Sequence, residues 1–462
     1  MSELSALQST LQSKFRSLGV KLFVVCGLAL VMMIPALLVA GLIEDRSQRA
    51  AEVVKEISAH VGGQQTFLGP TLAIPYSVRQ YPNIPERYGM YLVFPAKASA
   101  NFKIATTERH RSLFKVPVFQ VESKFDASFD LTGGRTALPQ GAELDWSRAE
   151  ILVGVTDPRG ALADAILTTS GKTLTLAPAE IAQTMSLAGS QPLPLNLTLF
   201  GAGVDGIAKP EQQFDVSSTL RFTGAQRIAL LAYGKTTHLS AQGDWPNPGF
   251  DGGFLPVTRT VSPTGFTADW AVPFIARGVR AEGARESVTG LDATALGISF
   301  IELADPYQSV NRSLKYVPLF LGLIFLSYFI FEVTTGKRLH PAQYVLVGAA
   351  QIIFYLLLLS LSERIGFDFG YLIGGSATVI LLAVNAGWIF ASRREAVKAS
   401  MIFTCLYVLI YLLLRLEDNA LLVGAIASFL AVGAVMYFTR GIDWYSSLST
   451  TGAGADGATA AS

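Results

Sequence analysis

The sequence has few charged residues and very few cysteines. Asp, Glu, Lys and Arg make up 15% of the 462 residues, against about 25% in an average soluble protein. The formal net charge is +1, so the chain lacks the concentrated basic excess with which proteins bind nucleic acid. Cys26 and Cys405 both lie inside apolar runs, which excludes a disulfide framework and a cysteine metal site. Because 50% of the residues are hydrophobic, the composition points to a membrane protein.

Catalytic and metal-binding patterns are also scarce. The sequence has no GxSxG motif and no HExxH motif. Ser112 and Lys115 have the spacing of penicillin-binding enzymes, but neither companion motif, SDN or KTG, is present. The four histidines are scattered along the chain: His60, His110, His238 and His340. We therefore expect no enzymatic activity, no cofactor and no metal, with a hydrolase built on Ser112 and Lys115 as a minor alternative.

The first long apolar run covers residues 22–43. It has no charged residue and is long enough to cross a bilayer, which takes about 20 residues. Basic residues precede it and Glu44 and Asp45 follow, which places the N-terminus in the cytoplasm. A cleaved signal peptide is the alternative, but its apolar region would have about 7–15 residues. We interpret the run as an uncleaved anchor that follows a cytoplasmic segment, residues 1–21.

Apolar runs return near the C-terminus and predict five more membrane helices. With the N-terminus inside, nine Lys and Arg residues flank the six helices on the cytoplasmic side and two on the outer side, as the positive-inside rule requires. Both termini are therefore expected in the cytoplasm, with a partly disordered tail over residues 439–462. The five runs are residues 317–335, 344–361, 369–390, 399–414 and 420–438.

A long segment, residues 44–316, separates the first two predicted helices and should lie outside the cytoplasm. Alternating apolar and polar residues predict strands over 119–131, 151–155 and 193–199. The segment is therefore expected to be a large, mainly-β domain of one or two lobes with a sandwich-like fold.

Two local signals refine the expected organisation of this domain. Apolar residues at helical spacing predict a short amphipathic helix over residues 49–61, ended by Gly62 and Gly63. Glycine and proline clusters at residues 69–70 and 245–249 are expected to separate strands.

Polar residues in or beside the apolar runs are the candidate functional residues, because charge at membrane depth is costly and should face protein or water. Glu332 is expected on the same helix face as Phe325, Tyr328 and Phe329. Its carboxylate is read either as a proton or ion relay or as a structural contact with a basic loop residue. The basic residues considered are Lys337, Arg338 and Arg394. The full set of candidates is Glu332, His340, Gln343, Tyr344, Glu363, Glu417, Asp418 and Arg440.

Two further patterns predict helix packing. Glu363 and Arg415 lie at the outer ends of two different helices, so opposite charges are expected to pair there. Gly370 and Gly374 are expected to let the fourth helix pack closely against a neighbour.

Ordered motifs along most of the chain resemble the CreD family of bacterial inner-membrane proteins. This sequence departs from the family pattern at Val61, Arg364 and Asn419. The motifs that carry the resemblance are GQQ at 63–65, DWP at 244–246, DPYQ at 305–308, HPAQY at 340–344, FYLLLLSLSE at 354–363, ED at 417–418 and DWY at 443–445.

The resemblance implies a non-enzymatic protein that supports cell-envelope integrity, the response to cell-wall-directed antibiotics or other envelope stress, and colicin tolerance. We expect its periplasmic domain to contact envelope proteins or cell-wall components. The resemblance supplies neither a substrate nor an oligomeric state. The alternative is an ion- or proton-coupled transporter centred on Glu332 and the loop at 340–344. The sequence lacks the pair of matching broken helices that usually marks a transport site.

Overall fold

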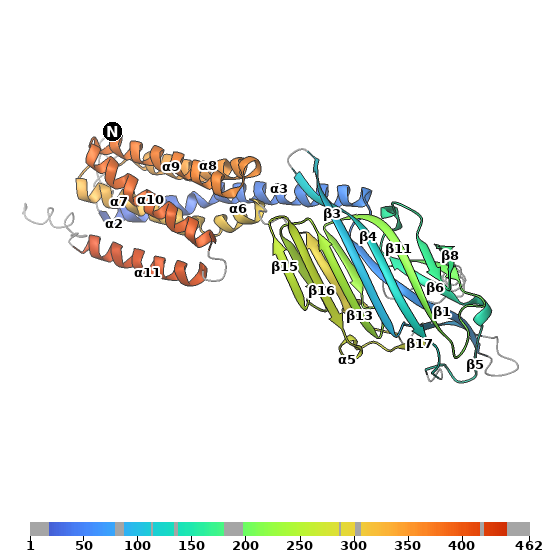
Figure 1. Ribbon diagram of the computed structural model, residues 1–462. Coiled ribbons are helices and arrows are strands. Elements are labelled where there is room, and N and C mark those ends of the chain that lie inside the picture. Colours follow the sequence, from blue (N-terminus) through green and yellow to red (C-terminus); the bar gives the residue numbers. More distant parts are fainter. Residues whose placement is uncertain are drawn as a thin grey trace, which may run out of the picture. The chain divides into compact units, whose positions relative to one another are not determined.

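The computed structural model describes residues 18–78, 87–111, 114–133, 137–179, 197–285, 288–300, 306–415 and 420–440. The chain divides into two units. Ala50–Leu303 forms one, and Met1–Arg49 together with Ala304–Ser462 forms the other. The first consists mainly of β-strands and the second of helices (Figure 1).

Within the described residues, five helices are long and apolar enough to cross a membrane, one near the N-terminus and four towards the C-terminus. A further helix, α11, has 20 residues and none of them is charged, and it coincides with the sixth predicted run. The α-helices are α2 (Leu18–Val31), α3 (Met33–His60), α5 (Phe274–Arg277), α6 (Pro306–Leu314), α7 (Val317–Thr335), α8 (Pro341–Ile365), α9 (Phe367–Phe390), α10 (Arg393–Arg415) and α11 (Ala420–Thr439).

Helices α2 and α3 follow one another with an interruption at Met32 alone. Pro35 explains the interruption, because proline has no N–H to donate and its ring opposes the carbonyl group four residues earlier, here that of Val31. Helix α3 then continues to His60, and Gly62 and Gly63 adopt left-handed conformations with φ of 89° and 60°. The helix predicted over residues 49–61 is confirmed as the second half of α3.

The β unit contains two sheets, which within the described residues have ten and eight strands. Most neighbouring strands are antiparallel, but β1 pairs with β12 and β3 pairs with β13 in parallel. The ten-stranded sheet runs in the order β14 (Pro248–Gly252), β18 (Ala295–Phe300), β12 (Arg227–Leu231), β1 (Gln65–Val78), β6 (Glu150–Val155), β10 (Thr198–Gly203) and β9 (Ala177–Pro178), with β2 (Arg87–Val93) and β5 (Ala142–Leu144) beside β1 and with β17 (Glu282–Ala284) beside β2.

The eight-stranded sheet carries the surface described below. Six of its strands lie side by side in Figure 1, from β15 to β11. Its order is β15 (Thr258–Ser262), β16 (Gly265–Val272), β13 (Thr236–Gly243), β3 (Lys97–Arg111), β4 (Phe114–Asp130), β11 (Gln213–Ala225), β7 (Ile166–Thr169) and β8 (Lys172–Thr175).

Strand β4 shows how alternation builds the core. Val121, Phe125 and Phe129 are buried, whereas Glu122 and Lys124 between them are exposed, because successive side chains of a strand point to opposite faces. The buried faces of both sheets share one apolar core. Burial of each phenylalanine in such a core contributes about 1.5–3 kcal/mol. The unit is therefore a β-sandwich in which each sheet turns one face to the core.

Two of the predicted strands correspond to observed ones and the third only in part. Residues 119–131 and 151–155 fall largely in β4 and β6. Of the strand predicted over 193–199, residues 193–196 lie outside the described residues, and β10 begins at Thr198.

One predicted separator is wrong. Gly69 and Pro70 lie inside β1, at a shift of register between Leu68 and Thr71. Glycine is required there because a Cβ atom on residue 69 would come within 2.6 Å of the Tyr233 ring. The pair therefore bends a strand instead of ending one, since a bulge accommodates both residues. The cluster at residues 245–249 begins after β13 ends and continues into β14.

The last turns of α3 belong to the β unit and pack against it. Residues of α3 and the segment after it form a small apolar cluster with β4 and β11, which attaches the end of the helix to the sandwich. The cluster consists of Val54, Ile57, Val61, Val116, Val118 and Ala225.

Candidate functional site

Glu332 lies near the end of α7 and forms an ion pair with Lys21 of α2. Its side chain is buried, with 4% of the residue exposed. Carboxylate atom Oε1 contacts Lys21 Nζ, and Oε2 accepts a hydrogen bond of 3.2 Å from the hydroxyl group of Tyr344 on α8. Lys21 Nζ also donates to the carbonyl oxygen of Leu339 over 2.9 Å. Three helices therefore meet at one carboxylate.

The partner of Glu332 was not among the basic loop residues considered from the sequence. Lys337 instead donates to the carbonyl oxygen of Phe390. A buried carboxylate is tolerated only when it is paired and hydrogen-bonded, and Lys21 and Tyr344 satisfy both oxygens. The predicted face of α7 is confirmed, since Phe325, Tyr328 and Phe329 are buried together with Glu332. The carboxylate is therefore held by one basic side chain and one hydroxyl group.

His340 and Gln343 do not join this contact. The His340 side chain is exposed, and its Nδ1 accepts a hydrogen bond of 3.2 Å from the backbone N–H of Ala342. It therefore serves as the N-cap of α8. Gln343 is half-buried, and its backbone N–H donates to the carbonyl oxygen of His340. Of the loop at 340–344, Tyr344 alone reaches Glu332 among the interactions described.

Charged residues at the other ends of the helices also pair between helices. Glu363 on α8 lies 3.9 Å from a guanidinium nitrogen of Arg46 on α3. Arg415 on α10 pairs with Asp368 on α9, and the hydroxyl group of Tyr411 donates to the same carboxylate over 3.1 Å. Opposite charges do pair between helices, but the partners shown are Arg46 and Asp368, and the expected pair of Glu363 with Arg415 is not among the interactions described.

Three candidates stand apart from these pairs. Arg440 is exposed and its guanidinium lies 4.3 Å from the centre of the Tyr437 ring, the geometry of a cation–π contact. Glu417 and Asp418 lie outside the described residues.

The predicted close approach of α9 to its neighbour is confirmed. A Cβ atom on Gly370 would lie 2.9 Å from the backbone nitrogen of Ser362 on α8, and one on Gly375 would lie 3.1 Å from the Tyr407 ring on α10. Gly374 faces Phe354 more loosely, at 3.7 Å. Helices α8, α9 and α10 thus pack through the glycine face of α9.

The structure also describes part of the residues considered for metal binding and for hydrolase chemistry. Among the described residues, no group of three or more His, Cys, Asp or Glu side chains could hold a metal ion. Lys115 lies 3.7 Å from Glu108 on the neighbouring strand, whereas Ser112 lies outside the described residues.

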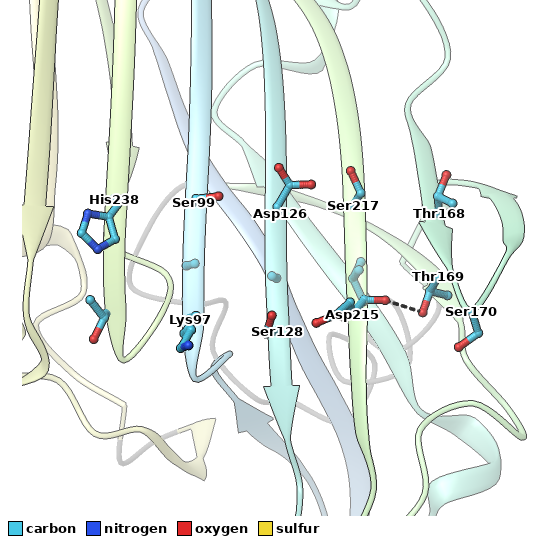
Figure 2. Close-up of a pocket in the computed structure, with 14 residues that line it drawn as sticks. Lys97, Ser99, Asp126, Ser128, Thr168, Thr169, Ser170, Asp215, Ser217 and His238 are labelled. Carbon is cyan, nitrogen blue, oxygen red and sulfur yellow. Dashed lines mark hydrogen bonds between the residues drawn. The ribbon is translucent and has the colours of Figure 1, made fainter.

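The β unit carries an open groove on the outer face of its eight-stranded sheet, with a volume of about 840 Å³. Figure 2 shows the polar side chains that line it, most of which form two rows across neighbouring strands. Strand registers place the residues of the first row directly beside one another. The first row is His238, Ser99, Asp126, Ser217 and Thr168, and the second is Lys97, Ser128 and Asp215. Thr169 is buried, and its hydroxyl group donates to the backbone carbonyl oxygen of Asp215. Ser170 lies in the turn after β7.

The groove lies over a buried tyrosine. The hydroxyl group of Tyr233 donates to the carbonyl oxygens of Ser99 on β3 and Asp126 on β4, at 2.7 and 3.1 Å. Burial, together with the nearby carboxylate of Asp126, raises the pKa of Tyr233 well above its usual value. The phenol is therefore a neutral donor that holds two central strands of the groove from the core side.

The chemistry of the groove is that of hydrogen bonding with weak net charge. Most of its polar side chains are those of serine and threonine. The titratable side chains that also line it are Lys97, Asp126, Asp215 and His238. Among the interactions of the described residues, no serine or threonine hydroxyl group of the groove forms a hydrogen bond with the His238, Lys97, Asp126 or Asp215 side chain. The arrangement suits recognition of a polar partner.

Comparison with known proteins agrees with the membrane architecture. The family model described as inner membrane protein CreD matches residues 17–445. The chain is also 30% identical over 440 residues to inner membrane protein CreD of Escherichia coli (strain K12), covering 91% of this chain and 92% of that protein. The match runs through both the β unit and the helical unit. This chain therefore belongs to the CreD family of inner membrane proteins.

Proposed function

We propose that this protein supports the integrity of the bacterial cell envelope through contacts made by its β unit. The observation that carries the proposal is the contrast between the two units. In the helical unit, Glu332, Glu363 and Asp368 each have a basic partner. The β unit presents an open, hydroxyl-rich groove instead. The helices serve as an anchor, and the groove is the surface that meets an envelope protein or a cell-wall component during envelope stress or colicin challenge.

The shape of the groove favours an extended partner. Its first row crosses five strands, and neighbouring strands lie about 4.8 Å apart, so the row is about 19 Å long. Its hydroxyl groups can both donate and accept hydrogen bonds, and the Asp126 carboxylate accepts them. Such a surface gains affinity from several hydrogen bonds in a row rather than from one buried anchor.

The proposed placement has six membrane helices, both termini in the cytoplasm and the β unit in the periplasm. Basic residues in the loops after α7 and α9 support it by the positive-inside rule. In a chain whose Cys26 and Cys405 are replaced by Ala, Ser217→Cys should react with a membrane-impermeant maleimide in cells with a permeabilised outer membrane. Lys398→Cys should react only after lysis. The reverse pattern would overturn the placement.

Filling the groove tests the contact itself. Ser217→Tyr and Asp126→Lys place bulk or opposite charge in the first row, and we expect loss of survival under cell-wall-directed antibiotics at a normal protein level. Thr219→Tyr is the matched control, because Thr219 is exposed on the same face of β11 but outside the groove. Full protection by both groove variants would contradict the proposal, as would equal loss in the control.

The alternative of an ion-coupled transporter has less support. Both oxygens of Glu332 are occupied, and His340 caps a helix instead of facing the carboxylate.

A further inference from the structure

The short helix α5 exposes two large apolar side chains at one end of the β unit. It follows strand β16 directly, with Pro273 between them, and Figure 1 shows it beyond the ends of β16 and β13. Ile275 is 92% exposed and Phe274 is 47% exposed. Side chains of both types are among those most often found inside proteins.

A second pair of exposed apolar residues lies beside α5. Leu255 and Val257 are 64% and 70% exposed. The backbone N–H of Val257 donates to the carbonyl oxygen of Asp269, and the Trp270 indole donates to the carbonyl oxygen of Phe254. Both bonds hold this segment against the part of β16 that leads into α5. Four exposed apolar side chains at one end of a sheet mark an interaction surface, here called the apolar tip: Leu255, Val257, Phe274 and Ile275.

A buried arginine holds α5 in place. Arg277, the last residue of α5, is buried, and its Nε donates to the carbonyl oxygen of Ala232 over 2.7 Å. Its guanidinium lies 4.2 Å from the centre of the Phe94 ring, the geometry of a cation–π contact. A rigid turn therefore displays Phe274 and Ile275, which cannot fold back onto the core.

Exposed cations flank the apolar tip on both of its segments. Residues 253–262 contain one arginine, Arg259, and no Asp or Glu. Residues 270–281 contain Arg280 besides the buried Arg277, again with no Asp or Glu. Both Arg259 and Arg280 are exposed. The two segments thus combine apolar side chains with positive charge.

The acidic residues that adjoin these segments do not face the apolar tip as free charges. The Asp269 carboxylate accepts a hydrogen bond from the Thr258 hydroxyl group and lies on the polar outer face of the sheet, opposite the buried Trp270. Glu282 is half-buried at the start of β17. Apolar side chains together with cations are the combination that binds anionic lipid surfaces.

We propose that the apolar tip inserts into the surface of a phospholipid bilayer that contains anionic lipid. Its four side chains enter the boundary between headgroups and acyl chains, and the guanidinium groups of Arg259 and Arg280 bind headgroup phosphates. Protruding side chains suit a bilayer, which needs no pocket of matching shape. Burying one exposed aliphatic side chain favours the bound state about tenfold or more. The contact is separate from the groove, since no residue of the apolar tip lines it.

The test uses the full-length chain, with Cys26 and Cys405 replaced by Ala, in nanodiscs of phosphatidylcholine and phosphatidylglycerol. Ile275→Cys carries an NBD fluorophore, and lipids with a doxyl quencher on the acyl chain are placed either in the nanodisc or in added vesicles of the same composition. The two arms distinguish insertion into the chain's own bilayer from insertion into a second one. We expect quenching in one of them.

The control for the label is Thr219→Cys with the same fluorophore, because Thr219 is exposed on the polar face of β11. It should stay unquenched in both arms. Absence of quenching from the label at residue 275 in both arms would overturn the proposal, and a protein partner or a second copy of the chain at the apolar tip would give that result. Equal quenching of the two labels would also overturn it.

Substitutions elsewhere in the apolar tip show whether the protein or the label enters the lipid. In the chain labelled at residue 275, Leu255→Ser together with Val257→Ser should reduce quenching at least twofold. Ile166→Ser is the matched control, since Ile166 is also exposed but lies on β7, and it should leave quenching unchanged. Unchanged quenching in the Leu255 and Val257 variant would show that the label alone enters the lipid, and the proposal would be wrong.

The role of the cations has its own readout. Arg280→Gln should reduce quenching when phosphatidylglycerol is present and leave it unchanged in pure phosphatidylcholine, because the attraction requires anionic headgroups. The same quenching as in the unsubstituted chain with both lipids would overturn the assignment of Arg280 to headgroup phosphate.

Discussion

Lys21 and Glu332 are 311 residues apart in the sequence and form an ion pair between α2 and α7. The pair joins the first helix of the described residues to a helix that follows the whole β unit in the sequence. Because Tyr344 of α8 binds the second carboxylate oxygen, the contact fixes three helices at once.

Glu332→Gln should destabilise the helical unit without abolishing function. The substitution leaves the Lys21 ammonium group without its counter-charge, which should lower the free energy of unfolding by about 2–3 kcal/mol. Adding Lys21→Met should recover much of the loss, since the two residues act as a pair. Thermal unfolding of the single and double variants measures this. Loss of envelope protection in Glu332→Gln at normal Tm and normal protein level would instead support a proton relay.

Gly370→Ala should loosen the contact between α8 and α9. The added Cβ atom would lie 2.9 Å from the Ser362 backbone, so the helices must separate, at a cost of about 1–3 kcal/mol. Gly322→Ala on α7 is the control, because a Cβ there meets nothing within 4 Å. It should be neutral or stabilising by up to about 1 kcal/mol. Equal unfolding temperatures for the two variants would refute the close packing.

Tyr233→Phe should weaken the strands beneath the groove. The variant loses the hydrogen bonds to the carbonyl oxygens of Ser99 and Asp126, and we expect a loss of about 1–2 kcal/mol. Limited proteolysis and thermal unfolding measure the effect. Wild-type resistance in both assays would show that the phenol does not hold β3 to β4.

The pair Asp157–Arg159 predicts a pH dependence. Hydrogen bonding from Arg159 lowers the pKa of Asp157 below its usual value of 3.8. A lowered folded-state pKa stabilises the fold above the unfolded pKa, and this stability is lost as the pH falls through the folded pKa. Because Arg159 is largely exposed, solvent screening keeps this contribution to stability small.

Asp157→Asn should therefore lower the Tm at pH 7, and the difference from wild type should shrink towards pH 3. Asp205→Asn, at an exposed carboxylate, should show no such convergence. Melting curves at pH 7, 5 and 3 measure both. A constant difference at every pH would rule out the ion pair as its cause.

The helices were predictable because their signal is local. A membrane helix is recognised from the apolar composition of one continuous segment. The end of α3 is recognised from Gly62 and Gly63, because glycine readily adopts the left-handed conformation that ends a helix. The partner of Glu332 was not predictable in this way. In the sequence, Lys21 is one of the basic residues that precede the first apolar run. No pattern near it indicates a partner 311 positions away.

The groove was hidden for a related reason. Alternation along β4 indicates which residues share a face, but not which strands lie next to it. His238 reaches the first row because β13 pairs with β3 in parallel, and Thr168 does so because β7 pairs with β11. Strand order depends on long-range packing, which a single sequence does not encode in any short pattern.

Strand β15 ends the eight-stranded sheet, and no further strand is described beside it. Such an edge invites addition of another chain. Here the edge strand has only five residues, Thr258–Ser262, and Pro256 and Pro263 flank it, each without an N–H to donate. Arg259 adds a charge in the middle. These features protect the edge against the addition of a strand from another molecule. The protein can therefore expose the broad polar face of this sheet without aggregating through strand β15.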